Sequence, residues 1–317
     1  MLKVENLVKK YGDKYAVNDV SFEIGEGEVV GFLGPNGAGK TTIMNIITGF
    51  LSYTSGSCTV DVFEILENPT EAKRLIGYLP DQPPLYPEMT VKEYLNFVFD
   101  LKGCTFNRKK HIMEVCEVTK IVDMRDRLIK NLSKGYCQRV GIAQALIGNP
   151  RIIILDEPTV GLDPKQIIEI RNLIRSLGRD HTVILSTHVL SEVQAVCDRI
   201  IIMNKGKIAA DERTDRLTEL MSGTRRLQVR IAGVRKTVLD SLNALENVSY
   251  VEAGKDMGGE TVYKIESKDG RDIRREVFEL CARNNTPILS METVTSSLED
   301  VFLNVTKDAA RGKRKEK

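Results

Sequence analysis

A glycine-rich segment between two apolar segments constrains the fold of this chain more than any other feature. Residues 34–41 read Gly-Pro-Asn-Gly-Ala-Gly-Lys-Thr; the apolar run 29–33 before them predicts a strand, and residues 41–49 predict a helix that ends at a glycine. Glycines let the loop turn so that successive N–H groups point at phosphate oxygens, and the helix adds the positive end of its dipole. The sequence therefore predicts a phosphate-binding loop after a strand.

The side chains of this loop have expected roles. Lys40 would reach the β- and γ-phosphates of a nucleotide, and the Thr41 hydroxyl would coordinate Mg²⁺. The expected nucleotide contacts in and after the loop are Gly34, Asn36, Gly37, Gly39, Lys40, Thr41 and Thr42.

An apolar run that ends in two acids indicates the chemistry. Residues 152–155 are too apolar for a one-sided strand and predict a strand buried on both faces. Asp156 then lies where a carboxylate can hold Mg²⁺, directly or through water. Glu157, the next residue, could orient or deprotonate an attacking water. After a phosphate loop in the same chain, this pair indicates a hydrolytic site.

Strands and helices alternate in the first part of the chain, which favours an α/β fold with a mostly parallel sheet. Thr90 and Glu93 form a capping box that opens one of the helices. Residues from about 83 to 148 are expected to form a helical subdomain inserted into the α/β core. Strands are predicted at 3–9, 16–24, 29–33, 152–155, 183–185 and 200–203, and helices at 41–49, 91–102, 108–120 and 164–177.

A second domain is predicted after the composition changes near residues 221–223. The first domain is placed at residues 1–221, the second at 224–306, and a charged, disordered tail at 307–317. The second domain is expected to be a small α+β sandwich of βαββαβ order. Its segments are 226–231, 236–245, 249–253, 261–266, 271–282 and 287–291, with a final helix at about 297–305.

These motifs together resemble those of the ATP-binding subunit of ABC transporters, over about residues 2–220. The resemblance identifies residues 34–41 as Walker A, 132–138 as the signature and 152–156 as Walker B. It implies a P-loop NTPase domain with an inserted helical subdomain, and ATP and Mg²⁺ as cofactors.

The resemblance also assigns the catalytic residues and the assembly. Glu157 is the expected catalytic glutamate, and His188, in Ser-Thr-His, the switch histidine that contacts the γ-phosphate or the attacking water. A head-to-tail dimer with a second copy, or with a homologous ATPase, is implied, with ATP between Walker A of one subunit and Ser133 and Gly135 of the other.

Two further nucleotide contacts follow from the family pattern. Asp163, in the D-loop, is expected among the nucleotide-binding residues. Tyr11 lies where the family places an aromatic residue that stacks on adenine.

The chain departs from the family pattern at two motifs. The signature reads Leu-Ser-Lys-Gly-Tyr instead of Leu-Ser-Gly-Gly-Gln, but Ser133 and Gly135 are kept. In the Q-loop, Asp81 occupies the glutamine position and Gln82 follows it. Either side chain could be the metal or water ligand, and Asp81 keeps the register.

An integral membrane permease is the partner that the resemblance implies. No apolar run reaches the roughly 20 residues that span a bilayer, so another subunit would have to cross the membrane. The proline-rich residues 83–89 are expected at the contact with it. The subunit would be cytoplasmic and peripheral on the inner face of the membrane. The formal net charge of +2 gives no reason to expect nucleic acid, and the six scattered cysteines are expected as reduced thiols.

The second domain resembles the C-terminal extension of ATPase subunits from ABC-2 type exporters. That group is linked to the export of drugs, antimicrobial peptides, sodium or polysaccharides. The alternative is a soluble ABC-type ATPase that acts on ribosomes or DNA. The single ATPase cassette and the lack of sustained heptads favour the transporter.

Overall fold

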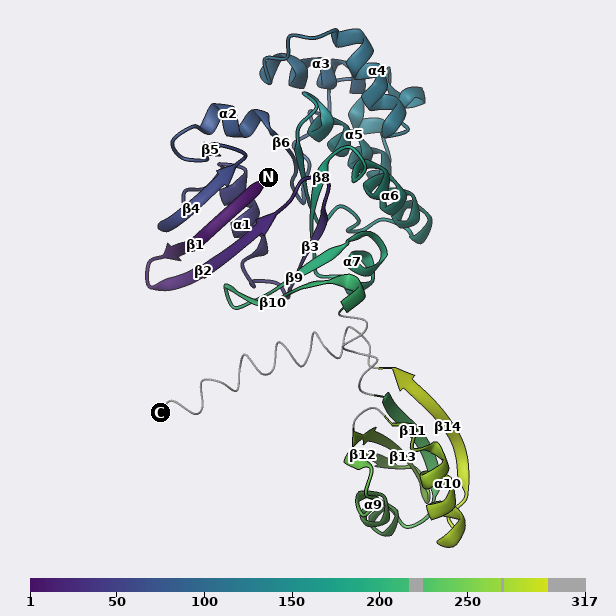
Figure 1. Cartoon of the computed structure of the whole chain (residues 1–317). Helices are drawn as coiled ribbons and strands as arrows, with labels where there is room; N and C mark the ends of the chain where they lie inside the picture. Colours follow the sequence, from purple (N-terminus) through teal and green to yellow (C-terminus); the bar gives the residue numbers. More distant parts are fainter. Residues whose placement is uncertain (217–224, 269–270, 296–317) are drawn as a thin grey trace. The chain divides into compact units, whose positions relative to one another are not determined.

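A computed structural model describes residues 1–216, 225–268 and 271–295. The chain divides into two compact units, Met1–Thr214 and Asp215–Lys317 (Figure 1). The final helix predicted near residues 297–305 and the charged tail at 307–317 lie outside the described residues.

A six-stranded sheet forms the centre of the first unit. Every residue of β3, β7 and β8 is buried, which explains why each strand carries a run of apolar residues rather than an alternating pattern. β10 is antiparallel to β9 and the other strands are parallel, so the carboxyl ends of β3, β6, β7 and β8 meet at one edge. In the order of the sheet, the strands are β10 (Lys207–Arg213), β9 (Arg199–Asn204), β3 (Val29–Leu33), β8 (Thr182–Thr187), β7 (Ile152–Asp156) and β6 (Ile76–Leu79).

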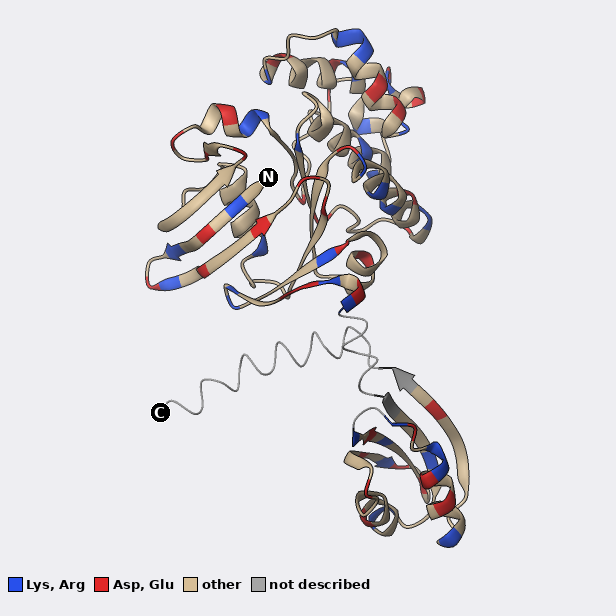
Figure 2. Cartoon of the chain, in the orientation of Figure 1, with Lys and Arg blue, Asp and Glu red and all other residues tan. Residues whose placement is uncertain are grey.

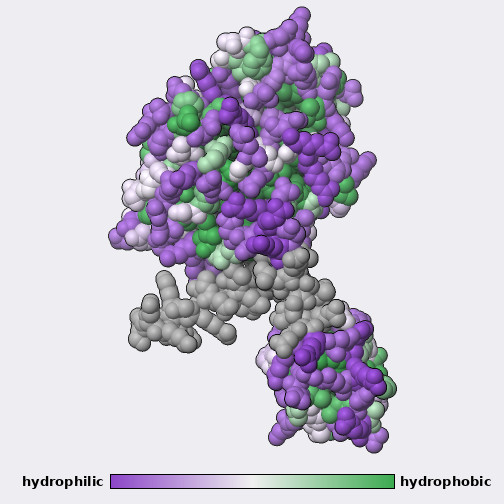
Figure 3. Space-filling view, viewed as in Figure 1, coloured by the Kyte–Doolittle hydropathy of each residue, from purple (hydrophilic) through white to green (hydrophobic). Residues whose placement is uncertain are grey.

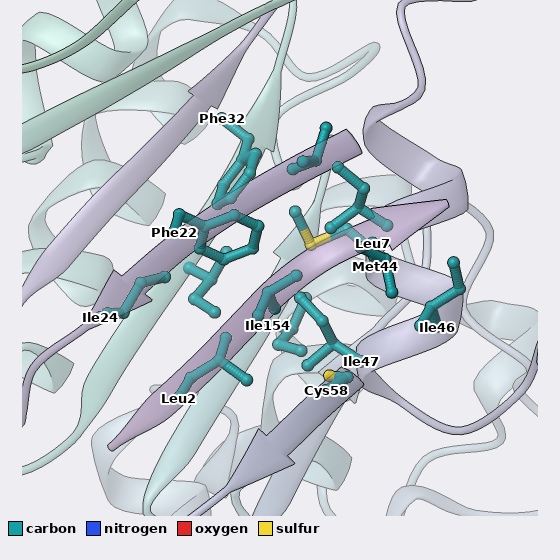
Figure 4. Packing of buried hydrophobic residues seen from close by; sticks show 14 of the residues in the cluster. Leu2, Leu7, Phe22, Ile24, Phe32, Met44, Ile46, Ile47, Cys58 and Ile154 are labelled. Carbon is teal, nitrogen blue, oxygen red and sulfur yellow. The ribbon is translucent and has the colours of Figure 1, made fainter. Parts of the chain in front are cut away.

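A second, antiparallel sheet and helix α1 (Lys40–Ile47) complete the core of this unit. Side chains from the two sheets and from α1 pack in one cluster; Phe22 and Phe32, one from each sheet, have ring centroids 5.1 Å apart (Figure 4). This packing fixes α1, and with it the loop before α1, against both sheets. The strands, in sheet order, are β2 (Lys14–Ile24), β1 (Leu2–Tyr11), β4 (Ser55–Val60) and β5 (Phe63–Glu64).

Helices α5, α6 and α7 pack against the six-stranded sheet, and α3 and α4 pack on α5 and on each other. The predicted capping box is present: Glu93 N donates to Thr90 Oγ1 at 3.2 Å, and Thr90 N donates to Glu93 Oε2 at 2.8 Å. The helices are α2 (Pro69–Arg74), α3 (Val91–Leu101), α4 (Arg108–Val118), α5 (Lys134–Leu146), α6 (Pro164–Leu177) and α7 (Leu190–Val196), with 3-10 turns η1 (Val122–Met124) and η2 (Ile129–Asn131).

The second unit has its own antiparallel sheet and its own hydrophobic core. Inward-facing residues alternate along its strands, as at Leu227, Val229 and Ile231, and the buried faces of two helices complete the core. In chain order the elements are β11 (Arg225–Ala232), α9 (Arg235–Asn243), β12 (Val248–Asp256), β13 (Glu260–Ser267), α10 (Arg274–Arg283) and β14 (Ile288–Thr295), and the sheet order is β12-β13-β11-β14.

Charged residues of both signs are interspersed along both units (Figure 2). The visible surface is mostly hydrophilic, with small scattered apolar areas (Figure 3). Within the described ranges, every helix is too short or too polar to cross a bilayer.

Candidate functional site

The loop between β3 and α1 needs its glycines for geometric reasons. Gly37 and Gly39 have φ values of 78° and 106°, in the left-handed region that favours glycine. A Cβ on Gly39 would lie 2.6 Å from the carbonyl oxygen of Ala16, and one on Gly34 would lie 2.5 Å from that of Met203. The loop is therefore shaped by backbone approach as well as by φ.

Lys40 lies at the start of α1 and folds back over this loop. Its side chain is buried, and Nζ donates to the carbonyl oxygens of Gly34 at 2.7 Å and Pro35 at 3.4 Å. Burial lowers the pKa of Lys40, and the nearby carboxylates of Glu157 and Asp156 oppose that shift. Among the described residues the hydrogen-bond partners of the Lys40 ammonium are neutral carbonyls, and a bound phosphate would give it an anionic one.

Asp156 ends β7 at the edge of the sheet and is almost fully buried. Burial raises the pKa of Asp156, while the hydroxyls of Ser186 and Thr41 act in the opposite direction. Asp156 Oδ1 has no hydrogen-bond partner, nor does Ser186 Oγ on the paired position of β8. A buried carboxylate oxygen with no partner, close to hydroxyls, is a donor set that suits Mg²⁺.

Glu157 has a positive φ, and both of its carboxylate oxygens have a side-chain partner. Its φ is 50°, and its N–H donates to Ser186 O at 2.8 Å, which ties the residue to the end of β8. Its Oε1 lies 2.9 Å from His188 Nδ1, and its Oε2 lies 3.2 Å from Thr187 Oγ1. The two residues predicted as catalytic are therefore in direct contact, although they lie 31 positions apart.

A cavity of about 280 Å³ brings most of the predicted nucleotide contacts together. Asp81 lines this cavity and Gln82 does not. Tyr11 also lies outside the lining: its ring is 54% exposed at the end of β1, with Lys9 Nζ 5.4 Å from its centroid. The lining residues are Asn36, Gly37, Ala38, Gly39, Lys40, Thr41, Thr42, Asp81, Asp156 and Glu157.

Two signature residues, Gly135 and Tyr136, line a different cavity, of about 380 Å³, and Ser133 is not among its lining residues. Ser133 is the N-cap of α5, where Oγ accepts from Tyr136 N at 3.4 Å, and Asp163 caps α6 by accepting from Gln166 N at 2.9 Å. Gly135 and Asp163 line this cavity, and the side chain of Gln166 lies so close to Gly135 that a Cβ there would meet it at 2.7 Å. The two cavities share no lining residue.

Lys134, which stands where the family signature has glycine, contacts a neighbouring loop. Its ammonium lies against the D-loop glycine Gly161, whose φ is 71°; a Cβ on Gly161 would come within 2.1 Å of Lys134 Nζ. Lys134 therefore connects the start of α5 with the segment that leads into α6.

Comparisons with known proteins agree with this geometry. A family model described as ABC transporter matches residues 17–160. The uncharacterized ABC transporter ATP-binding protein YxlF of Bacillus subtilis is 36% identical, over 96% of this chain and 99% of the relative. The chain belongs to the ABC transporter family, among its ATP-binding proteins. The linearmycin resistance ATP-binding protein LnrL of the same organism is 34% identical, over 96% of this chain and 98% of the relative.

A solved structure supports the same conclusion. A dimeric ATP-binding cassette in a post-hydrolysis state, bound to ADP and Pi, superposes with a TM-score of 0.61 at 31% identity and covers 68% of this chain and 99% of its own. The predicted fold class and the predicted ATPase activity of this ABC protein are confirmed.

Sequence reasoning missed three residues of this ABC ATPase that lie beside Glu157. Thr159, Thr187 and Glu192 are buried, and the hydroxyls of the two threonines each donate to the carboxylate of Glu192. Glu192 lies in the first turn of the short helix α7, and the sequence alone does not distinguish a buried glutamate at such a position from a solvent-exposed one. The contact appears only when the ends of β7 and β8 are paired.

Another cavity, of about 560 Å³, lies elsewhere in the ABC ATPase unit, beside α4 and the end of α6. None of the predicted site residues lines it. Its wall includes His111, which accepts from Gly148 N at 3.2 Å, and His181, whose Nδ1 lies 2.7 Å from Pro150 O. Both histidines thus have backbone partners in the segment before β7.

Proposed function

We propose that this protein is the ATP-hydrolysing subunit of an exporter of the ABC-2 type, in which ATP closes a dimer with a second copy or with a homologous ATPase, and hydrolysis reopens it. The observation that carries the proposal is the separation of the two cavities. The phosphate loop, Asp156 and Glu157 lie at one cavity, and Gly135 and Asp163 lie at the other. In a head-to-tail dimer with a second copy or with a homologous ATPase, one nucleotide would contact both sets.

Glu157 is the proposed general base for the attacking water. Its carboxylate lies at the carboxyl end of β7, lines the nucleotide cavity and is oriented by His188 at 2.9 Å. With the carboxylate as acceptor, Nδ1 of His188 carries the proton, which leaves Nε2 for the γ-phosphate or the water.

Mg²⁺ would be held by Asp156 and Thr41, with Asp81 favoured over Gln82 because it lines the cavity. Within the described residues no group of three or more His, Cys, Asp or Glu side chains is arranged to hold a metal. This agrees with a site in which nucleotide phosphates and water complete the coordination. When bound, Mg²⁺ would neutralise developing phosphate charge.

Tyr11 and the signature complete the proposed contacts with ATP. The exposed ring of Tyr11 is available to stack on adenine. Ser133, Gly135 and Asp163 would face the nucleotide of the other copy, where the first turn of α5 offers free N–H groups and its dipole.

A separate integral membrane permease is the proposed partner, with the ATPase peripheral on the cytoplasmic face of the membrane. The likeness to a linearmycin resistance protein supports export of an antibiotic-like compound. Tyr86, 50% exposed and 5.5 Å from the Phe97 ring, presents an aromatic surface in the proline-rich segment that we assign to the permease contact.

The Glu157→Gln variant tests the hydrolytic part of the proposal. It should bind ATP, form a dimer that elutes as such in gel filtration with ATP, and lose about 10²- to 10³-fold in kcat, because it lacks the base. Glu64→Gln, a matched change at a carboxylate on β5, should behave as wild type. Full turnover by Glu157→Gln would remove Glu157 as the base.

Co-purification tests the partner. The ATPase should be retained by an affinity-tagged multi-span permease encoded beside it, and its ATPase rate should rise in that complex. A stable complex with ribosomes or DNA instead would support the alternative, a soluble ATPase.

A further inference from the structure

The hydroxyl of Thr187 lies between two glutamates. Thr187 Oγ1 is 3.0 Å from Glu192 Oε2 and 3.2 Å from Glu157 Oε2, and it accepts a hydrogen bond from Val189 N at 3.1 Å. A threonine hydroxyl has one proton. It can therefore donate to only one of the two carboxylates at a time.

The second glutamate is enclosed. Glu192 is 5% exposed, and Thr187 and Thr159 are 0% and 4% exposed. Thr159 Oγ1 donates to Glu192 Oε1, so both carboxylate oxygens of Glu192 accept from hydroxyls. Among the described residues Glu192 forms no ion pair, and these two hydroxyls are its side-chain partners.

This arrangement distinguishes the two oxygens of Glu157. Oε1 is occupied by His188, at 2.9 Å. Oε2 faces the Thr187 hydroxyl at 3.2 Å, and Glu192 Oε2 is the nearer acceptor for that hydroxyl, at 3.0 Å. An oxygen without a donated proton is the more basic one and keeps a lone pair free for a water proton.

We infer that Glu192 is a positioning residue for the general base: it accepts the proton of Thr187 and thereby keeps Glu157 Oε2 free. The inference rests on the proposed role of Glu157. Glu192 acts through Thr187, and Thr159 donates to its other oxygen. The segment after β7 and the last residue of β8 are therefore held to the same carboxylate.

The Glu192→Gln variant reverses this hydrogen bond without changing the size of the side chain. Its amide oxygen can still accept from Thr159, and its amide N–H donates to Thr187 Oγ1. The Thr187 proton then turns to Glu157 Oε2. We expect kcat to fall by roughly tenfold while KM for ATP and ATP-dependent dimerisation stay near wild type, because the base is weakened and binding is not.

A double-mutant cycle with Thr187 tests whether the effect passes through the hydroxyl. In a Thr187→Val background no proton can be redirected, so adding Glu192→Gln should cost no further activity. In a Thr187→Ser background, which keeps a hydroxyl, the tenfold loss should return. All variants are assayed as full chains, with kcat expressed per ATP-binding site.

Three results would overturn the inference. One is an unchanged kcat in Glu192→Gln. Another is a loss that persists undiminished in the Thr187→Val background, which would mean that Glu192 supports only the fold. The third is a change in KM alone. The Glu157→Gln variant in the same assay distinguishes the two proposals. Full activity of Glu157→Gln would refute Glu157 as the base. An inactive Glu157→Gln together with a fully active Glu192→Gln would refute only the role of Glu192.

Discussion

At the scale of single residues, the nucleotide site combines groups that are costly to bury without a ligand. Lys40 is buried against backbone carbonyls, and Asp156 Oδ1 has no partner. Both features fit a site whose missing partners are phosphate and a cation. Bound ATP and its cation would therefore supply charged partners to Lys40 and Asp156.

A Lys40→Met variant should separate binding from folding. Loss of the charged contact should weaken ATP affinity by about 10- to 100-fold, as measured by fluorescent-nucleotide titration. The melting temperature without nucleotide should not fall, because burial disfavours the charged form of Lys40 in the folded state. Lys110→Met, at an exposed lysine of α4, is the matched control, and equal ATP affinity in the two variants would contradict the assignment of the loop.

At the scale of elements, α5 carries the signature at its start and is closed at its end by a lysine from another segment. Lys102 Nζ, just after α3, donates to Ile147 O at 2.6 Å and to Ala145 O at 3.4 Å. A cation there also lies at the negative end of the helix dipole. The end of α3 is therefore tied to the end of the helix that begins at the signature.

The pH dependence of stability should reveal this contact. Burial lowers the pKa of Lys102 to about 8, from an ordinary value of 10.5. Between these values the unfolded chain binds more protons at Lys102 than the folded protein, so the Lys102 contribution to stability rises as pH increases from 8 towards 10.5. Urea unfolding at pH 7 and pH 10 should therefore show wild type gaining stability relative to Lys102→Met. If the free energy of unfolding of wild type relative to Lys102→Met fell as pH rises, the lowered pKa of Lys102 would be contradicted.

Some elements were accessible to sequence reasoning and others were not. The segment from β3 to α1 and the start of α3 carry local signals: an apolar run, glycines and a capping box. The short strands β4 and β5 carry none, since β4 reads Ser-Gly-Ser-Cys-Thr-Val and is fixed by its antiparallel register with β1. Long-range pairing decided their structure.

At the scale of the whole molecule, the chain forms two units with separate hydrophobic cores. The sequence predicts a border near residue 221, and the chain divides into its compact units between Thr214 and Asp215. The residues of the nucleotide cavity and of the signature cavity all belong to the first unit.

A fragment of residues 1–216 should therefore fold and bind ATP with an affinity within about threefold of the full chain, since its core and cavity are complete. Calorimetry and nucleotide titration of the fragment and the full chain would measure this. A fragment that aggregates or loses ATP binding would show that the first unit needs the second.

The sequence by itself determined the motifs, the strands that lead into the phosphate loop and the acidic pair, and the family, because loops, caps and buried strands are specified by neighbouring residues. Only the tertiary structure decided which distant groups lie together. Asp81 lines the nucleotide cavity and Gln82 does not, and the Thr187 hydroxyl lies between the carboxylates of Glu157 and Glu192. Those contacts depend on the order and register of β3, β8, β7 and β6, which bring together residues that are tens of positions apart. Sheet pairing over such separations is set by the packing of the whole unit, which no local pattern encodes.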